Sequence, residues 1–220
     1  MNALQIVELL WHGLLETLYM VLTSTALAYV LGLPLGILLV VTDENGIKPA
    51  PAFSKVLGMI VNIVRSIPFV ILLVWVNPVT RALIGTTLGP TATIVPLVFA
   101  SAPYIARMVE ASLKEVDAGV VEAAQSMGAT PMQIVAKVLL PEARSALIVG
   151  SAIAAVTILG YSAMSGFTGG GGLGTVAINY GYYRYQTDIM MFNVILSVIV
   201  VQVLQEIGTR FARRFDRRAR

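Results

Sequence analysis

The sequence contains no cysteine and only one histidine, His12, among its 220 residues. Without cysteine there are no disulfides, no thiolate nucleophile and no cysteine-ligated metal site. Charge is scarce as well, because Asp, Glu, Lys and Arg make up 12% of the chain, where a soluble domain carries roughly 25%. These absences exclude a disulfide scaffold and disfavour both redox chemistry and a soluble globular domain.

Basic residues are concentrated at one end of the chain. Fifteen Lys and Arg against twelve Asp and Glu give a formal net charge of +3, and six of the basic residues lie within residues 210–220. The excess therefore belongs to a terminal segment and not to a basic face, so no nucleic-acid partner is expected. We expect this segment to rest on anionic lipid headgroups.

Long apolar stretches take the place of charge, and 57% of the residues are apolar. A helix that crosses about 30 Å of hydrocarbon needs about 20 apolar residues. Turn residues at Asn77-Pro78 and Gly89-Pro90 divide the longest stretch into two. The glycine run 169–172 ends another stretch, since each glycine costs a helix about 1 kcal/mol. The sequence thus predicts an all-helical membrane protein with five spans, at about residues 18–41, 57–76, 91–108, 146–167 and 187–207.

The distribution of Lys and Arg predicts the orientation, since cytoplasmic loops hold the excess of basic residues. With the N-terminus outside, twelve basic residues lie on the cytoplasmic side and only Arg81 and Arg184 lie outside. Segment 109–145 and the C-terminus are then cytoplasmic. We expect the first span to be retained, because its flank carries Glu8 and Glu16 and no basic residue, unlike a secretory signal.

The segment 109–145 has the pattern of two short helices. Asp117 can cap a helix over residues 118–127, where apolar residues recur at helical spacing and Glu122 falls toward the other face. Gly128 is suited to end that helix in a left-handed conformation, and Thr130-Pro131 is a start signal for a second helix. On this pattern alone, an ordinary solvated loop is an equal alternative.

The spacing of residues within this segment decides between the alternatives. It resembles the EAA loop of ABC importer permeases, whose pattern is EAA, three residues, Gly, nine residues, Ile, one residue, Leu-Pro. Val138 in place of Ile is the one departure. In that family the loop is the coupling helix, which docks in a groove of the ATP-hydrolysing subunit. The resemblance implies that the residues coupled to the ATPase are Glu122, Ala123, Ala124, Met127, Gly128, Ala129 and Pro131.

Further motifs lie at residues 62–69, 106–110, 128–135, 160–164, 170–174 and 180–182. In these segments the chain resembles the methionine-uptake permeases, the membrane subunits of D- and L-methionine ABC importers. The match covers most of the chain from the first span to the fifth, and the extreme tail is unspecific. It implies the type I ABC importer permease fold, one multi-pass permease domain over residues 1–220, and methionine transport by alternating access in the bacterial inner membrane.

The energy for transport is expected to come from a partner, because the sequence contains no Gly-x-x-x-x-Gly-Lys-[Ser/Thr] phosphate loop. The resemblance implies a homodimer of permeases, two ABC ATPases that use ATP and Mg, and an extracytoplasmic methionine-binding protein. We expect no cofactor, metal or catalytic residue on this chain itself. The coupling loop is shared across importers and does not indicate which solute is transported. A permease for another amino acid or small polar solute is therefore the alternative function.

Three side chains within the spans are candidates for the translocation path. Tyr161 and Met164 lie one turn apart and can face a dimer axis together, where the flexible thioether of Met164 would seal a narrow path. Ordinary packing is the alternative for Met164. Arg65 can reach the cytoplasmic interface, pair with a carboxylate such as Glu110, or face the path. Pro68 is expected to kink the same span.

The loop between the fourth and fifth spans lies outside in this orientation, and we expect it to contact the binding protein. Gly171 and Gly172 would let the backbone turn sharply there, and Tyr182 and Tyr183 would supply aromatic contacts. An interfacial aromatic belt is an equal alternative for the tyrosines.

A membrane enzyme or an assembly scaffold is the hypothesis from a different class. No acid, base, nucleophile or metal-binding set is clustered in or beside the spans, which disfavours an enzyme. Replacing Glu122 or Gly128 should abolish coupling in a transporter, and would leave the activity of an enzyme or scaffold intact. The remaining polar residues within the spans are expected to form hydrogen bonds between helices: Asn62, Asn193 and Gln202.

Overall fold

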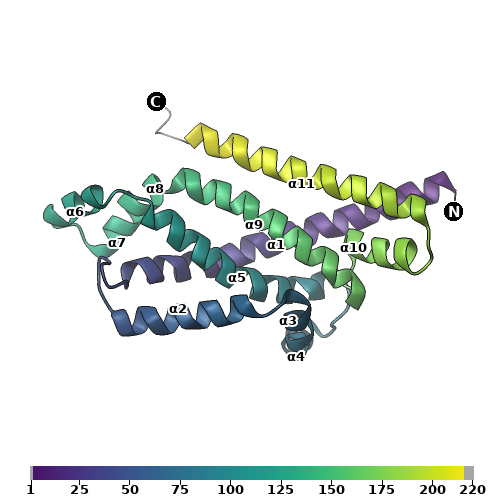
Figure 1. Cartoon of the computed structure of the whole chain (residues 1–220), viewed down its shortest axis with the longest axis horizontal. Coiled ribbons are helices and arrows are strands. Elements are labelled where there is room, and N and C mark those ends of the chain that lie inside the picture. Colours follow the sequence, from purple (N-terminus) through teal and green to yellow (C-terminus); the bar gives the residue numbers. More distant parts are fainter. Residues whose placement is uncertain (1, 216–220) are drawn as a thin grey trace.

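The computed structural model describes residues 2–215, and every regular element among them is helical. Figure 1 shows an elongated bundle whose long helices run along its length. Among the described residues, four helices are long and apolar enough to cross a membrane, and a bent helix pair is a fifth candidate. The four are α1 (Ala3–Val41), α5 (Pro90–Lys114), α9 (Arg144–Met164) and α11 (Thr187–Phe215), and the bent pair is α2 (Pro51–Ser66) with α3 (Phe69–Trp75).

Short helices lie at both ends of the bundle, which we name the α6 end and the α10 end (Figure 1). The chain begins at the α10 end, and α11 runs back to the α6 end (Figure 1). The α6 end carries α6 (Ala118–Ser126), α7 (Pro131–Ile134), the π-helix η1 (Val135–Leu139) and α8 (Leu140–Glu142). The α10 end carries the 3-10 helix η2 (Ser165–Thr168), α10 (Gly172–Val176) and the π-helix η3 (Ala177–Tyr182), while α4 (Asn77–Ile84) lies beside α3 along the side of the bundle (Figure 1).

The helices extend beyond the apolar stretches from which they were predicted. α1 begins at Ala3, where Asn2 and Gln5 form a capping box, and not near residue 18. α5 continues to Lys114 and α11 to Phe215. Hydropathy marks where a helix can lie in lipid and says nothing of where its backbone hydrogen bonds stop, so these helices run past the predicted ends.

The second span is broken and not merely kinked. α2 and α3 meet at an angle of 100°. Ile67 has an extended backbone (φ −78°, ψ 122°), and Pro68 is the N-cap of α3. A proline has no N–H to donate and disfavours helical geometry in the residue before it, so a new helix begins after Pro68. The single helix predicted over residues 57–76 is therefore wrong, although its break falls where the proline predicts.

Close backbone contact joins α1 to α5. Gly32 and Gly36 face α5, and a Cβ atom added at either glycine would lie 2.7 Å or less from the carbonyl oxygen of Ala102 or Ala106. Within a membrane there is no hydrophobic driving force to hold two helices together, so they associate through close packing. Small residues such as glycine allow the two backbones to approach closely enough for this. This contact fixes α5, and with it the start of α6, relative to α1.

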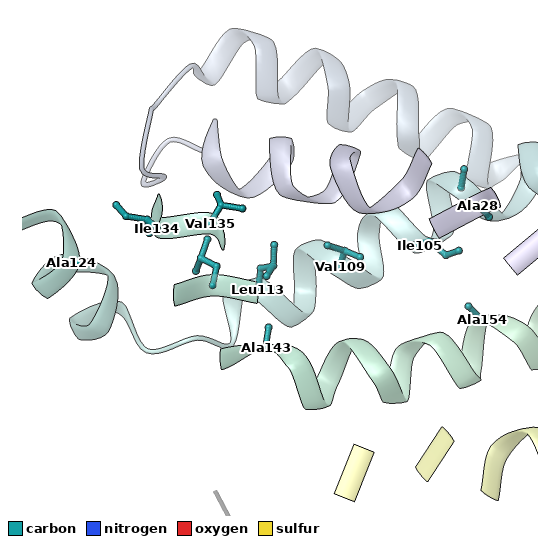
Figure 2. Close-up of a cluster of buried hydrophobic side chains, with 11 residues drawn as sticks. Ala28, Ile105, Val109, Leu113, Ala124, Ile134, Val135, Ala143 and Ala154 are labelled. Carbon is teal, nitrogen blue, oxygen red and sulfur yellow. The ribbon is translucent and has the colours of Figure 1, made fainter. Parts of the chain in front are cut away.

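Two groups of buried apolar side chains form the core. One surrounds Met20, Leu97 and Ile158 toward the α10 end. The other lies toward the α6 end, where Figure 2 shows Val109 and Leu113 of α5 near Ile134 and Val135 of the segment that follows α6. The segment between α5 and α9 is therefore packed on the bundle and is not a free loop.

Candidate functional site

Capping residues set where the helices begin and end within residues 117–134, which we name the coupling segment after the role predicted for it. Asp117 accepts a hydrogen bond from the backbone N–H of Gly119 at 2.7 Å, and Gly128 ends the helical turn with a φ of +78°. Thr130 then caps α7 in a capping box with Gln133, and Pro131 takes the first helical position. The predicted helix–glycine–helix arrangement is confirmed.

The apolar side chains of the coupling segment point in two directions. Ala124 is buried in the core at the α6 end, and Val121 packs beside it. Met127, by contrast, is 81% exposed, and Met132 on α7 is 75% exposed. A single apolar stripe through Met127 is thus wrong, because Met127 is already the C-cap and the chain leaves the helical period there.

The other residues predicted to couple to the ATPase lie mostly at the surface of this segment. Glu122, Ala123, Gly128 and Pro131 are exposed and Ala129 is half-buried. Glu122 also lines a groove of about 530 Å³ between α6 and the loop that follows α1. Met132, which was not among the predicted residues, is a further exposed apolar side chain on this surface.

A chain of charged side chains joins α5 to the connection between α1 and α2, near the α6 end. Lys114 Nζ lies 2.8 Å from Asp43 Oδ2 and 2.9 Å from Glu110 Oε1, and Arg107 Nη1 lies 2.6 Å from Glu110 Oε2. The hydrogen bond from Lys114 lowers the pKa of the Asp43 carboxyl below its usual range. The spacing of Arg107, Glu110 and Lys114 on one helix is the sequence signal for this chain of ion pairs.

These ion pairs change the interpretation of Arg65. Glu110, the carboxylate suggested as its partner, is paired with Arg107 and Lys114 instead. Arg65 is exposed on α2. The predicted interhelical hydrogen bonds of two polar residues are confirmed, since Asn62 accepts from Arg107 and Asn193 donates to the carbonyl of Leu173, whereas Gln202 is exposed.

The two residues predicted to form a gate lie on adjacent turns at the end of α9. Tyr161 is half-buried, and its ring stacks on Phe69 with centroids 4.7 Å apart and planes 8° from parallel. Met164 is 45% exposed. Tyr161 is thus packed against the first residue of α3, while almost half of Met164 lies outside the core of its own chain.

Glycines at the α10 end bring backbones into contact. Gly171 and Gly172 have φ values of +86° and +72°. The N–H of Gly172 donates to Glu16 Oε2 at 2.6 Å, and the N–H of Leu173 donates to Thr17 Oγ1 at 2.8 Å. Gly172 is buried against α1, so its predicted role as an outer contact is wrong and it serves packing instead.

The aromatic residues of this loop behave differently. Tyr182 and Tyr183 are 59% and 61% exposed, with their rings 5.4 Å apart. They remain available to a partner or to a membrane interface.

Within residues 2–215, no three His, Asp or Glu side chains gather in an arrangement that could hold a metal ion.

Residues 32–220 match the family model described as the binding-protein-dependent transport system inner membrane component. The chain belongs to this family. It is a transporter subunit and not an enzyme, as the sequence predicted, and the permease fold is confirmed.

Part of the basic segment 210–220 is described, and there Arg210 pairs with Glu206, while residues 216–220 lie outside the described chain.

Named relatives resemble this permease along most of its length. It is 47% identical over 211 residues to a probable D-methionine transport system permease protein MetI of Vibrio cholerae, covering 96% of this chain and 94% of the relative. It is 51% identical over 158 residues to the MetI protein of Escherichia coli strain K12, covering 72% and 73% of the two chains.

Solved structures agree with the fold of this permease. A chain of the MetNI methionine ABC transporter in an inward-facing conformation superposes with a TM-score of 0.97 at 46% identity, covering 99% of this chain and 100% of the other. A chain of an amino acid ABC transporter shares the fold with a TM-score of 0.79 at 19% identity. The predicted family of ABC importer permeases is therefore confirmed.

Proposed function

We propose that this chain forms the translocation path of an ATP-driven importer for methionine. The observation that carries the proposal is the 47% identity to a MetI permease over nearly the whole chain, together with the TM-score of 0.97 to a chain of MetNI. A likeness of this extent covers the spans, the coupling segment and the outer loop together. Both D- and L-methionine belong to the proposed substrate range.

The coupling segment is the surface to which the ATPase subunit binds. Met127 and Met132 expose flexible apolar side chains on a helix pair whose opposite face is anchored in the core. Burying one such side chain in a partner groove contributes about 1.5–3 kcal/mol. Two copies of an ATPase would bind here and use ATP and Mg, since this sequence contains no phosphate loop of its own.

The translocation path lies between two copies of the chain, related by a twofold axis. Met164 is suited to meet its symmetry mate, because the residue is 45% exposed and Tyr161 beside it stacks on Phe69. Closure of the ATPases draws the coupling segments together and opens the path outward, and hydrolysis reverses the motion. Arg65, exposed on α2, is a further candidate to face this path.

The outer surface of the loop before α11 would contact an extracytoplasmic methionine-binding protein. Tyr182 and Tyr183 are the exposed residues that support this contact, with Gly171 shaping the backbone beneath them. The proposed orientation has the α10 end outside and the α6 end in the cytoplasm of a bacterium, with the chain in its inner membrane.

The decisive experiment is uptake of radiolabelled methionine by vesicles that contain this chain, its ATPase and its binding protein. ATP-dependent accumulation that unlabelled D- or L-methionine inhibits supports the proposal. Saturation by an amino acid without a thioether, at lower concentration than methionine, would assign the chain to another cargo. Met164→Ala should change both basal ATP hydrolysis and uptake, and the gate assignment fails if neither changes.

A further inference from the structure

Helix α2 is held only weakly by apolar contacts within its own chain. Of its sixteen residues, only Gly58 and Val61 are buried. Side chains on its other faces, such as Met59 and Ile63, are 62% and 58% exposed. A 100° bend separates it from α3, so α3 does not hold it in line. The position of α2 therefore depends strongly on the few polar contacts that it makes.

Arg107 of α5 supplies these contacts with one guanidinium group. Its Nε donates to Asn62 Oδ1 at 3.1 Å, and its Nη2 donates to the carbonyl oxygen of Gly58 at 2.8 Å. Its Nη1 donates to Glu110 on its own helix at 2.6 Å. The planar fork of arginine can make all three bonds at once, which the single ammonium of a lysine cannot do with the same geometry.

Gly58 is the position on α2 that admits this approach. A Cβ atom added there would lie 3.0 Å from Arg107 Nη2. The absence of a side chain leaves the backbone carbonyl open to the guanidinium. Arg107 thus binds both the backbone of α2 and the side chain of Asn62. The contact with α2 therefore does not depend on the rotamer of one side chain alone.

The same chain of polar contacts reaches the coupling segment. Glu110 pairs with Lys114, the last residue of α5, and Lys114 pairs with Asp43 in the connection between α1 and α2. α6 begins at Ala118, after the short connection 115–117 that follows α5. A displacement of α6 therefore acts first on the end of α5 that carries these charges.

We infer that Arg107 is the positioning residue that makes α2 follow α5 when the coupling segment moves. This inference rests on the proposed function, because it requires an ATPase that moves α6. In this arrangement the exposed face of α2, including Arg65, changes position together with α5. Apolar packing alone would let α2 lag behind, since so little of it is buried.

The test uses the absence of cysteine from the sequence, because one introduced cysteine gives one spin label per protomer. Labels at Lys55→Cys on α2 and at Gln125→Cys on α6, in separate samples of the whole complex in vesicles, report distances between the two protomers. With native Arg107, addition of ATP should shift both distances. With Arg107→Lys, the Gln125 label should still shift and the Lys55 label should not.

A functional measurement accompanies the distances. Arg107→Lys should lower methionine uptake per ATP hydrolysed by about tenfold, the factor for loss of one hydrogen bond to a charged group. Asn62→Ala, which removes the side-chain acceptor on α2 and keeps the carbonyl of Gly58, should lower the ratio in the same direction by a smaller factor, and it serves if Arg107→Lys fails to fold. Ser66→Ala is the matched control, because its hydroxyl bonds within α2 to the carbonyl of Asn62 and does not contact Arg107. A merely structural role would reduce the yield of the complex and leave the ratio unchanged.

Two results would overturn the inference, and they are distinguishable. If the Lys55 label still shifts with ATP in both the Arg107→Lys and Asn62→Ala proteins, α2 does not follow through Arg107. If the Gln125 label does not shift even with native Arg107, then ATP does not move the coupling segment, and the proposed coupling function itself is wrong.

Discussion

The two ends of the bundle are held together by different means. At the α10 end, backbones touch through glycines, and the N–H groups of residues 172 and 173 donate to the side chains of Glu16 and Thr17 on α1. At the α6 end, long charged side chains span between elements, and apolar residues of the coupling segment are exposed. Backbone contacts tolerate almost no displacement, whereas flexible charged side chains do. The contrast lies in the contacts that join elements, which are backbone contacts at the α10 end and side-chain ion pairs at the α6 end.

The largest expected effect comes from adding volume at the α10 end. A Cβ at Gly174 would lie 2.7 Å from the Cα of Ala163, so Gly174→Ala must separate α10 from α9. We expect a loss of about 3 kcal/mol in the free energy of unfolding, measured by thermal denaturation of the purified protein. Gly160→Ala on α9 is the control, since a Cβ there meets no atom within 4 Å. Equal stability of the two variants would contradict the rigid packing of this end.

A change at the α6 end should leave stability alone and affect assembly. Met127→Glu introduces charge at a side chain that is 81% exposed, so the unfolding temperature should not change. Binding of the ATPase should weaken by about 2 kcal/mol, the loss typical of a central interface residue. Asn179→Glu, at an exposed position of η3 at the opposite end of the bundle, serves as the control in the same pull-down measurement. Unchanged binding by Met127→Glu would remove this residue from the interface.

The bond between Glu16 and the backbone of Gly172 gives a smaller effect. Glu16→Ala leaves that N–H without its acceptor, which should cost about 1.5 kcal/mol of stability. Glu16→Gln keeps an acceptor oxygen and should recover part of the loss. Glu8→Gln, at an exposed position of the same helix, should change nothing. If thermal denaturation ranks Glu16→Ala with Glu8→Gln, the bond does not hold the outer end.

The smallest effect concerns pH at the α6 end. The pKa of Asp43 lies below its usual value because Lys114 donates to it, so the charged carboxylate favours the folded state. That contribution is complete above the ordinary carboxyl pKa of about 3.9 and is lost as the pH falls through the lower folded value. Asp43→Asn should flatten the acid side of the stability profile. An identical acid profile for both proteins would show that this solvent-accessible pair contributes nothing.

Composition and spacing predicted the fold class and the coupling segment, because both depend on local rules. Apolar stretches of sufficient length and the Asp117, Gly128 and Thr130 capping residues act over a few residues. The contacts of Arg107 with α2 join residues 45 and 49 positions apart, and no local rule predicts such a pairing. The burial of Gly172 was not predicted for the same reason, since it depends on contact with Thr17 of α1, which is distant in the sequence.

The central claim is that the coupling segment is the cytoplasmic surface on which the ATPase acts. Met127→Cys supplies a single cysteine in this chain, and a crosslinker at that position tests the claim most directly. We expect a covalent product with the ATPase subunit in inside-out vesicles, and no reaction with a membrane-impermeant maleimide added to intact cells. A product that lacks the ATPase, or labelling from outside intact cells, would contradict the account.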